Sequence, residues 1–165
     1  LFLRCCSDAC TAFGPLVRHI AATGGTLAGQ ENHLDMVRVG IGLYGYLPSG
    51  FFLPQGSLGR AMRVYAQAVC SRSSARGWAG YGTLPAPQKL SVLRAGYADG
   101  LFRKGGFGNV NNLCMDAALL PVSLKKYGYV CVFSDADRIA AENGTISYEA
   151  LCCAGRRAER IYVER

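Results

Sequence analysis

The sequence lacks the features that mark membrane and secreted proteins. No apolar run reaches the ~18–20 residues that a membrane-spanning helix needs, because Gly, Arg or Asp interrupts every candidate. The stretch from Leu1 to Cys10 contains Arg4 and Asp8 and does not have the ordered regions of a signal peptide. Methionine is also missing from the first position, so we expect the chain to be part of a longer one. We expect a cytoplasmic protein with no membrane partner.

The sequence also lacks the spacing of a metal-binding cysteine motif. Eight cysteines are present, but no two of them form a CxxC pair, and Cys5–Cys6 and Cys152–Cys153 are directly adjacent. Disulfide frameworks belong mainly to smaller secreted domains. We therefore expect reduced thiols and no metal.

The net charge of +7 is unevenly distributed along the chain. Residues 1–54 contain three basic and three acidic residues, so the whole excess lies in residues 55–165. A basic excess can bind nucleic acid or an anionic substrate, but no stripe of Lys and Arg alternates with aromatic residues. We expect no nucleic-acid partner. The alternative, a basic β-domain that binds nucleic acid, would show a strong loss of affinity with salt.

The composition predicts a packed fold in two parts. Half of the 165 residues are hydrophobic and 18% are charged, as in globular proteins. Leu47–Gly59 contains Pro48, Pro54 and three glycines, which is typical of a linker. We place a domain boundary there, between residues 1–54 and 55–165.

The first part has a mixed pattern of helix and strand. Cys10–Ile20 has apolar spacings compatible with a helix, although Gly14 and Pro15 interrupt them. Met36–Tyr46 is rich in β-formers and predicts a strand. Its three internal glycines indicate a close approach of another backbone.

The second part has the pattern of a small all-β domain, barrel-like or sandwich-like. Short β-like runs alternate with turn residues, and they cover Met62–Cys70, Leu90–Ala95 and Tyr129–Phe133, with a turn at Ala79–Gly82. A helix is expected over Thr145–Ala154 with Thr145 as its cap, followed by a last strand over Arg160–Val163. The fold class of the whole chain is therefore mixed α/β.

Five islands of sequence resemble the pyridoxal-phosphate-dependent alanine racemases and occur in that family's order. They are His19–Thr23, Asp35–Gly45, Gly96–Gly100, Cys114–Asp116 and Gly144–Glu149. The resemblance implies a (β/α)8 TIM barrel followed by a C-terminal β-domain that completes the site across a head-to-tail homodimer. Residues 1–54 would then be the remnant of the barrel, because a whole barrel takes ~250 residues. Residues 55–165 would be the β-domain.

The resemblance implies that Tyr97 and Met115 act on the substrate. Racemisation removes a proton from one face of the α-carbon and delivers one to the other, so it needs a group on each side. Tyr97 would be one of these groups, although a free tyrosine, with a pKa near ~10, needs a nearby charge or hydrogen bond to act as a base. The backbone N–H of Met115 would meet the substrate carboxylate.

The resemblance also implies a set of cofactor-binding residues. Arg38 would face the pyridine nitrogen of pyridoxal 5'-phosphate, and an arginine there leaves the ring a weaker electron sink than a carboxylate would. This favours racemisation over transamination. The phosphate would be bound by Thr23, Gly40, Ile41 and the hydroxyl of Tyr148.

Two departures from the family bear on activity. The family's cofactor-bearing lysine has no match among the four lysines present, Lys89, Lys104, Lys125 and Lys126, so we expect the isolated chain to be inactive. The segment Gly105–Leu113 is shorter than the family's hairpin before the Cys-Met-Asp island. We predict part of an alanine racemase, which supplies D-alanine for peptidoglycan. A serine racemase of the same family and a non-catalytic dimerisation or binding module are the alternatives.

Overall fold

The computed structural model describes residues 1–54, 57–84, 86–104 and 112–164. The chain divides into two compact units, Leu1–Ala61 and Met62–Arg165, called unit 1 and unit 2 below. The predicted short segment before Cys114 lies mostly outside the described residues, as do residues 55 and 56 at the predicted domain boundary. Within the described ranges, no helix has both the length and the apolar character needed to cross a bilayer.

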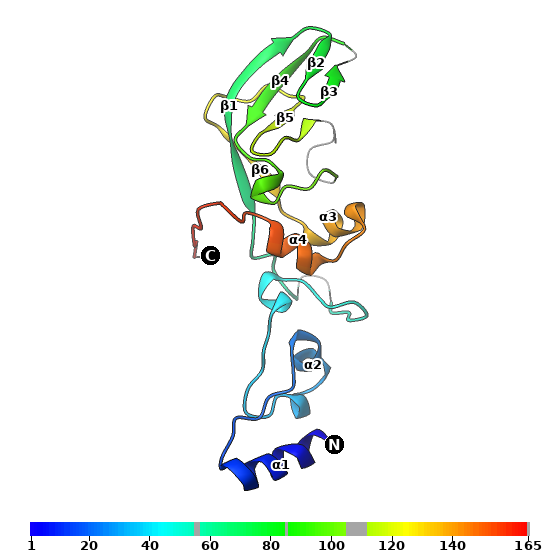
Figure 1. The fold of residues 1–165 in the computed structure, drawn as a ribbon, viewed down its shortest axis with the longest axis vertical. Coiled ribbons are helices and arrows are strands. Elements are labelled where there is room, and N and C mark those ends of the chain that lie inside the picture. The colour runs from blue at the N-terminus through cyan, green and yellow to red at the C-terminus, as the bar shows by residue number, and fades with distance from the viewer. Residues whose placement is uncertain (55–56, 85, 105–111, 165) are drawn as a thin grey trace. The chain divides into compact units, whose positions relative to one another are not determined.

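Unit 1 consists of short helices joined by extended segments (Figure 1). Its elements are α1 (Phe2–Phe13), α2 (Thr23–Ala28) and two 3-10 helices, η1 (Gln30–Asn32) and η2 (Ile41–Tyr44). The expected helix over Cys10–Ile20 is wrong in its position. α1 ends at Gly14, which has a φ of 87° and donates its N–H to the Cys10 carbonyl (2.9 Å). Pro15 then disfavours helical backbone at the residue before it.

The strand expected over Met36–Tyr46 is also wrong. Only Arg38 forms a β-bridge, a parallel one with Ala22, and the run then turns into η2. η2 ends at Gly45 in a left-handed conformation with a φ of 83°. The expected close approach is confirmed at Gly45, where a Cβ would lie 2.1 Å from the Gly59 carbonyl oxygen.

Unit 2 is built on a four-stranded antiparallel sheet with a separate hairpin (Figure 1). The sheet has the order β5-β4-β1-β6, and its strands are β1 (Val64–Ser74), β4 (Gln88–Leu93), β5 (Ala118–Leu120) and β6 (Tyr129–Phe133). The hairpin joins β2 (Gly77–Ala79) to β3 (Gly82–Leu84) through the predicted turn. The structure confirms the β-rich second part of the chain.

The core of unit 2 lies against this sheet, and the hydroxyls of two serines on the sheet hydrogen-bond to the loop that follows β5. The buried cluster includes Ala68, Leu93 and Val132. The Ser71 and Ser91 hydroxyls contact each other at 2.5 Å, and Ser91 donates to the Val122 carbonyl (2.7 Å). Because Ser91 is fully buried, these bonds satisfy a hydroxyl that would otherwise destabilise the core.

Two helices complete unit 2. They are α3 (Ala136–Asn143) and α4 (Ser147–Cys153). The predicted helix over Thr145–Ala154 is confirmed, but its cap is Ile146. Thr145 instead donates its amide to the Ala140 carbonyl (3.0 Å), which closes the end of α3. The predicted last strand over Arg160–Val163 is not formed, since these residues join no ladder among the described strands.

Candidate functional site

Thr23 is the centre of a small polar cradle in unit 1. Its hydroxyl oxygen accepts hydrogen bonds from the amides of Gly40 (3.1 Å) and Gly42 (3.3 Å). Thr23 is buried, and a Cβ on Gly42 would lie only 2.9 Å from Thr23 Cγ2, so the close approach depends on glycine. Within the described residues, neither the Thr23 hydroxyl hydrogen nor the Ile41 amide has an acceptor. Both are therefore available as donors.

Arg38 is held beside this cradle by its backbone and by its side chain. Its amide donates to the Ala21 carbonyl (2.8 Å), within the parallel bridge between Ala22 and Arg38. A guanidinium nitrogen contacts Nδ1 of His19, which lies four residues before Thr23. The structure thus brings Arg38, Thr23, Gly40 and Ile41, which the sequence predicts as one binding set, into one small region of unit 1.

The two extended segments that carry this region begin at an ion pair. Arg18 donates from Nε and a terminal nitrogen to the two carboxylate oxygens of Asp35, both at 2.8 Å, and its amide also donates to Asp35 (2.9 Å). These side-chain and backbone hydrogen bonds from Arg18 hold the pKa of the Asp35 carboxyl well below its usual range. The pair fixes the register of the two segments before the Ala22–Arg38 bridge.

Tyr97 begins a tight 3-10 turn in unit 2, η3 (Tyr97–Asp99). The Asp99 carboxylate accepts a hydrogen bond from the Gly96 amide (2.8 Å), and the turn ends at Gly100 with a φ of 88°. Tyr97 itself is 39% exposed. The turn therefore presents the phenol at the surface of unit 2 on a short, closed piece of backbone.

The turn is hydrogen-bonded directly to the segment that carries Met115. The Tyr97 amide donates to the Cys114 carbonyl (3.1 Å), and the Ala98 amide donates to the Met115 carbonyl (2.8 Å). A Cβ on Gly96 would lie 2.4 Å from both carbonyl oxygens, so only glycine allows this contact. The Met115 amide has no acceptor in the part of the chain that the structure describes. Tyr97 and a free backbone donor are thus brought together.

Charged groups lie close to the turn, and sequence reasoning missed one of them, Arg157. The Arg103 guanidinium lies over the Tyr97 ring, 5.6 Å from its centroid. Arg157 donates from Nε to Asp99 (2.8 Å). No sequence signal could have paired Asp99 with a residue so far along the chain, and the same holds for the contact of His19 with Arg38.

Tyr148 lies in the first turn of α4 and is 44% exposed. The hydroxyl of Thr145, two residues before α4, donates to the carboxylate of Glu149 in the first turn of the helix. Among the described residues no hydrogen bond of the Tyr148 hydroxyl is present, so its role as a phosphate ligand stays a prediction.

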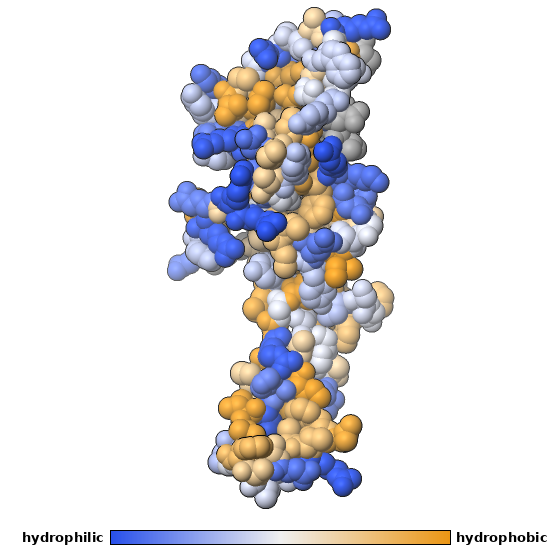
Figure 2. Space-filling model, viewed as in Figure 1, coloured by the Kyte–Doolittle hydropathy of each residue, from blue (hydrophilic) through white to orange (hydrophobic). Residues whose placement is uncertain are grey.

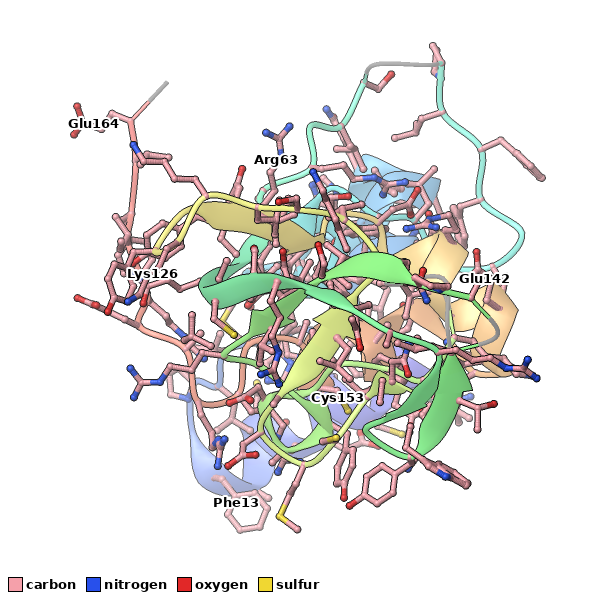
Figure 3. All side chains as sticks on the ribbon, turned by 90° about the horizontal axis from the view of Figure 1, so that it is seen from above. Phe13, Arg63, Lys126, Glu142, Cys153 and Glu164 are labelled. Atoms are coloured by element: carbon pink, nitrogen blue, oxygen red, sulfur yellow. The ribbon has the colours of Figure 1, made fainter. Side chains whose placement is uncertain are left out.

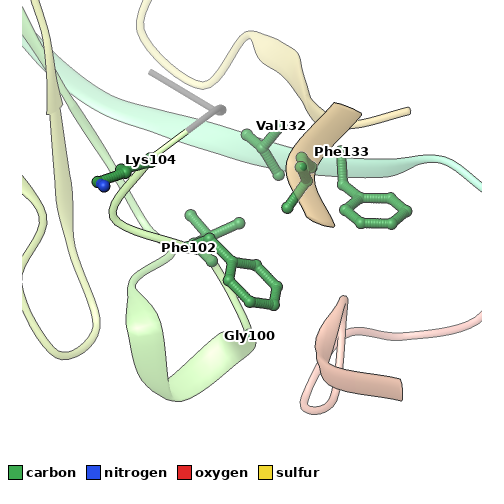
Figure 4. Close-up of a pocket in the computed structure, with 7 residues that line it drawn as sticks. Gly100, Phe102, Lys104, Val132 and Phe133 are labelled. Atoms are coloured by element: carbon green, nitrogen blue, oxygen red, sulfur yellow. The ribbon is translucent and has the colours of Figure 1, made fainter. Parts of the chain in front are cut away.

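A small cavity lies behind the Tyr97 turn (Figure 4). It is lined by Gly100, Leu101, Phe102, Lys104, Val132, Phe133 and Ile139. The space takes about one water molecule, so it is a packing defect and not a substrate site.

Comparison with known families agrees with this arrangement. Residues 61–162 match the family described as "Alanine racemase, C-terminal domain", and residues 2–48 match "Alanine racemase, N-terminal domain". The chain therefore belongs to the alanine racemase family.

Individual relatives match most of this chain but only part of their own length. The alanine racemase of Desulfovibrio desulfuricans is 35% identical, over 90% of this chain and 46% of that protein. That of Dinoroseobacter shibae is 34% identical, over 88% of this chain and 46% of that protein. The chain spans about half the length of the curated relatives it matches.

Solved structures agree as well. The alanine racemase of Clostridium difficile 630 matches with a TM-score of 0.78 and 29% identity, over 95% of this chain and 47% of that one. The alanine racemase of Bartonella henselae, solved with covalently bound pyridoxal phosphate, matches with a TM-score of 0.69 and 27% identity, over 95% and 50%. The fold is that of alanine racemases.

Proposed function

We propose that this chain is the C-terminal part of a cytoplasmic, pyridoxal-phosphate-dependent alanine racemase, an isomerase that interconverts L- and D-alanine and supplies D-alanine for peptidoglycan. Residues 1–54 are the last part of a (β/α)8 barrel, and residues 55–165 are a β-domain that completes the site of a homodimer. The parallel Ala22–Arg38 bridge supports the first assignment, because neighbouring strands of such barrels are parallel.

The donor set of unit 1 fits a phosphorylated cofactor. A phosphate needs several hydrogen-bond donors, and the Thr23 hydroxyl and the Ile41 amide are uncommitted within the described residues. Gly40 supports this set through its bond to Thr23, and the Tyr148 hydroxyl would add a further donor. Arg38, fixed by His19, would face the ring nitrogen and keep a positive charge there. When bound, pyridoxal phosphate makes the hydrogen on the substrate α-carbon acidic by withdrawing electrons.

The residues of unit 2 would act on the substrate. The Tyr97 hydroxyl would accept or deliver the proton on one face of the α-carbon, and the Met115 amide would bind the carboxylate. The observation that carries this proposal is the direct bonding of the two segments, through the Tyr97 and Ala98 amides. A base and a carboxylate donor joined in this way can hold one substrate in a fixed orientation.

Isotope exchange in a fused enzyme tests the role of Tyr97. The chain is fused to the preceding part of an alanine racemase barrel that carries the catalytic lysine, and washout of the α-proton into heavy water is measured for each enantiomer. Tyr97→Phe removes only the hydroxyl, so exchange should fall by ~10²–10⁴ for one enantiomer and survive for the other. Tyr81→Phe, an exposed tyrosine in the hairpin turn, is the matched control. Near-native exchange of both enantiomers in Tyr97→Phe would rule the proposal out.

The alternatives differ in what the fused enzyme would do. A serine racemase would exchange the α-proton of serine faster than that of alanine. The names of the two relatives described above favour alanine as the substrate, since both are alanine racemases. A non-catalytic module would leave the fusion inactive with both amino acids. No contact among the described residues favours either alternative.

A further inference from the structure

The Asp99 carboxylate joins the Tyr97 turn to the segment that follows α4. One oxygen, Oδ2, accepts from the Gly96 amide at 2.8 Å and closes the Tyr97 turn. The other, Oδ1, accepts from Nε of Arg157 at 2.8 Å, across 58 residues of sequence. Because the turn is also bonded to the Cys114–Met115 segment, a change at Arg157 can reach both proposed substrate contacts.

The end of α4 lies against the same turn. A Cβ on Gly100 would lie 1.6 Å from the Cys153 carbonyl oxygen, so the two backbones are in direct contact. Gly155, with a φ of 65°, then turns the chain so that Arg157 reaches Asp99. Figure 3 labels Cys153 at this end of the helix. The helix that carries Tyr148 and the turn that carries Tyr97 are thus fastened by a backbone contact and an ion pair.

The electrostatics of the pair are those of a partly buried contact. The Asp99 side chain is 22% exposed and that of Arg157 is 56% exposed. Burial acts to raise the pKa of the Asp99 carboxyl, but the hydrogen bonds from Arg157 and from the Gly96 amide outweigh it, and the pKa lies below its usual value. Asp99 is therefore ionised and paired at neutral pH.

We propose that Asp99 and Arg157 are a positioning pair, which holds the Tyr97 hydroxyl and the Met115 amide in a fixed relation by fastening their turn to the end of α4. The inference rests on the proposed function for the roles of Tyr97 and Met115. Neither Asp99 nor Arg157 touches the substrate. Their effect is on the geometry of the groups that do, where small displacements strongly lower the rate.

Amide hydrogen exchange of the 165-residue chain tests the pair without cofactor. Arg157→Gln should raise exchange at the Tyr97 and Ala98 amides by about tenfold, since the turn loses a charged hydrogen bond and opens locally. The β1–β4 ladder should keep its protection. Arg156→Gln is the matched control, because the Arg156 side chain is exposed and has no partner among the described residues. Unchanged turn amides, or an equal rise at the ladder amides, would contradict the proposal.

The roles of the two Asp99 carboxylate oxygens can be tested separately. Asp99→Asn keeps an acceptor for the Gly96 amide and removes the charge, so it should resemble Arg157→Gln. Asp99→Ala removes both hydrogen bonds and should raise hydrogen exchange at the Tyr97 and Ala98 amides further. If Asp99→Asn leaves the turn amides unchanged while Asp99→Ala frees them, the carboxylate acts only as a local cap and the pair has no positioning role.

The fused enzyme separates a failure of this inference from a failure of the proposed function. Arg157→Gln should slow α-proton exchange about tenfold for the enantiomer that Tyr97→Phe affects, and its effect should be smaller in the Tyr97→Phe background, where only the Met115 contact is left to disturb. A silent Tyr97→Phe would contradict the proposed function whatever Arg157 does. A strong effect of Tyr97→Phe with a silent Arg157→Gln would contradict the positioning pair alone.

Discussion

The two units of the chain differ in how they bury apolar surface. Unit 2 has a contiguous core against its sheet, with Leu93 and Ala68 fully buried. In unit 1, α1 has no buried residue, and Phe13 is 82% exposed and projects away from the ribbon (Figure 3). Figure 2 shows apolar side chains gathered on the visible face around α1 and α2.

The difference shows what each unit requires in order to be stable. Burial of apolar side chains is the main favourable term in folding, and unit 2 obtains it from its own residues. Unit 1 buries fewer apolar side chains among its described residues, and polar contacts such as that of Arg18 with Asp35 join its segments. Its exposed apolar side chains, such as those of Leu3 and Phe13, have no such core to cover them among the described residues.

The largest expected effect tests this contrast with one substitution made in each unit. Leu93→Ala in β4 leaves a cavity in the core of unit 2 and should lower the free energy of unfolding by about 2–5 kcal/mol. Leu3→Ala in α1, where the side chain is 60% exposed, should change it by less than about 0.5 kcal/mol. Denaturant titration followed by circular dichroism measures both. Equal losses would mean that α1 is covered in solution, by self-association for example.

A second prediction sharpens the contrast within unit 2. Gly100 and Gly144 both have positive φ at the end of a helix, but a Cβ would meet the Cys153 carbonyl only at Gly100 and has open space at Gly144. Gly144→Ala should lose about 1 kcal/mol from backbone strain alone. Gly100→Ala should lose a further ~1–3 kcal/mol from the overlap.

The same denaturant titration measures this pair. Similar losses in the two variants would show that the end of α4 does not lie against the Tyr97 turn. That outcome would also remove one of the two contacts on which the positioning pair rests.

The comparison of units also explains which features the sequence could predict. β6 was predicted with its observed bounds because Tyr129–Phe133 has the β-branched and aromatic pattern of a half-buried strand. Met36–Tyr46 has a similar composition, but the described residues of unit 1 offer it a single bridge and no neighbouring strand, and the glycines allow η2 instead. Propensity alone cannot distinguish these cases, since the sheet partner decides between them.

In the candidate site, too, the sequence indicates single residues but not their partners in the fold. Family resemblance identified Tyr97, Met115, Arg38 and Thr23, because each stands in a short motif. The residues that hold them could not be found in this way. His19 contacts Arg38 from another segment, and Arg157 reaches Asp99 across 58 residues, so only the folded chain brings them together.

The smallest expected effect compares the two Arg–Asp pairs, one in each unit. Both Asp35 and Asp99 have a lowered pKa, so each pair stabilises the fold above the unfolded value of ~3.9 and loses that contribution as the pH falls through the folded value. Carboxyl carbon shifts in an acid titration should therefore give midpoints below ~3.9 for both. The side chain of Asp35 is 38% exposed and that of Asp99 is 22% exposed. Salt should therefore weaken the attraction between Asp35 and Arg18 more than that between Asp99 and Arg157. At ~1 M salt, where the Debye length is ~3 Å, the midpoint of Asp35 should rise more than that of Asp99. An Asp35 midpoint near ~4 at every salt concentration would show that Arg18 does not hold the two segments of unit 1 together, and the Thr23 cradle would then depend on its own hydrogen bonds.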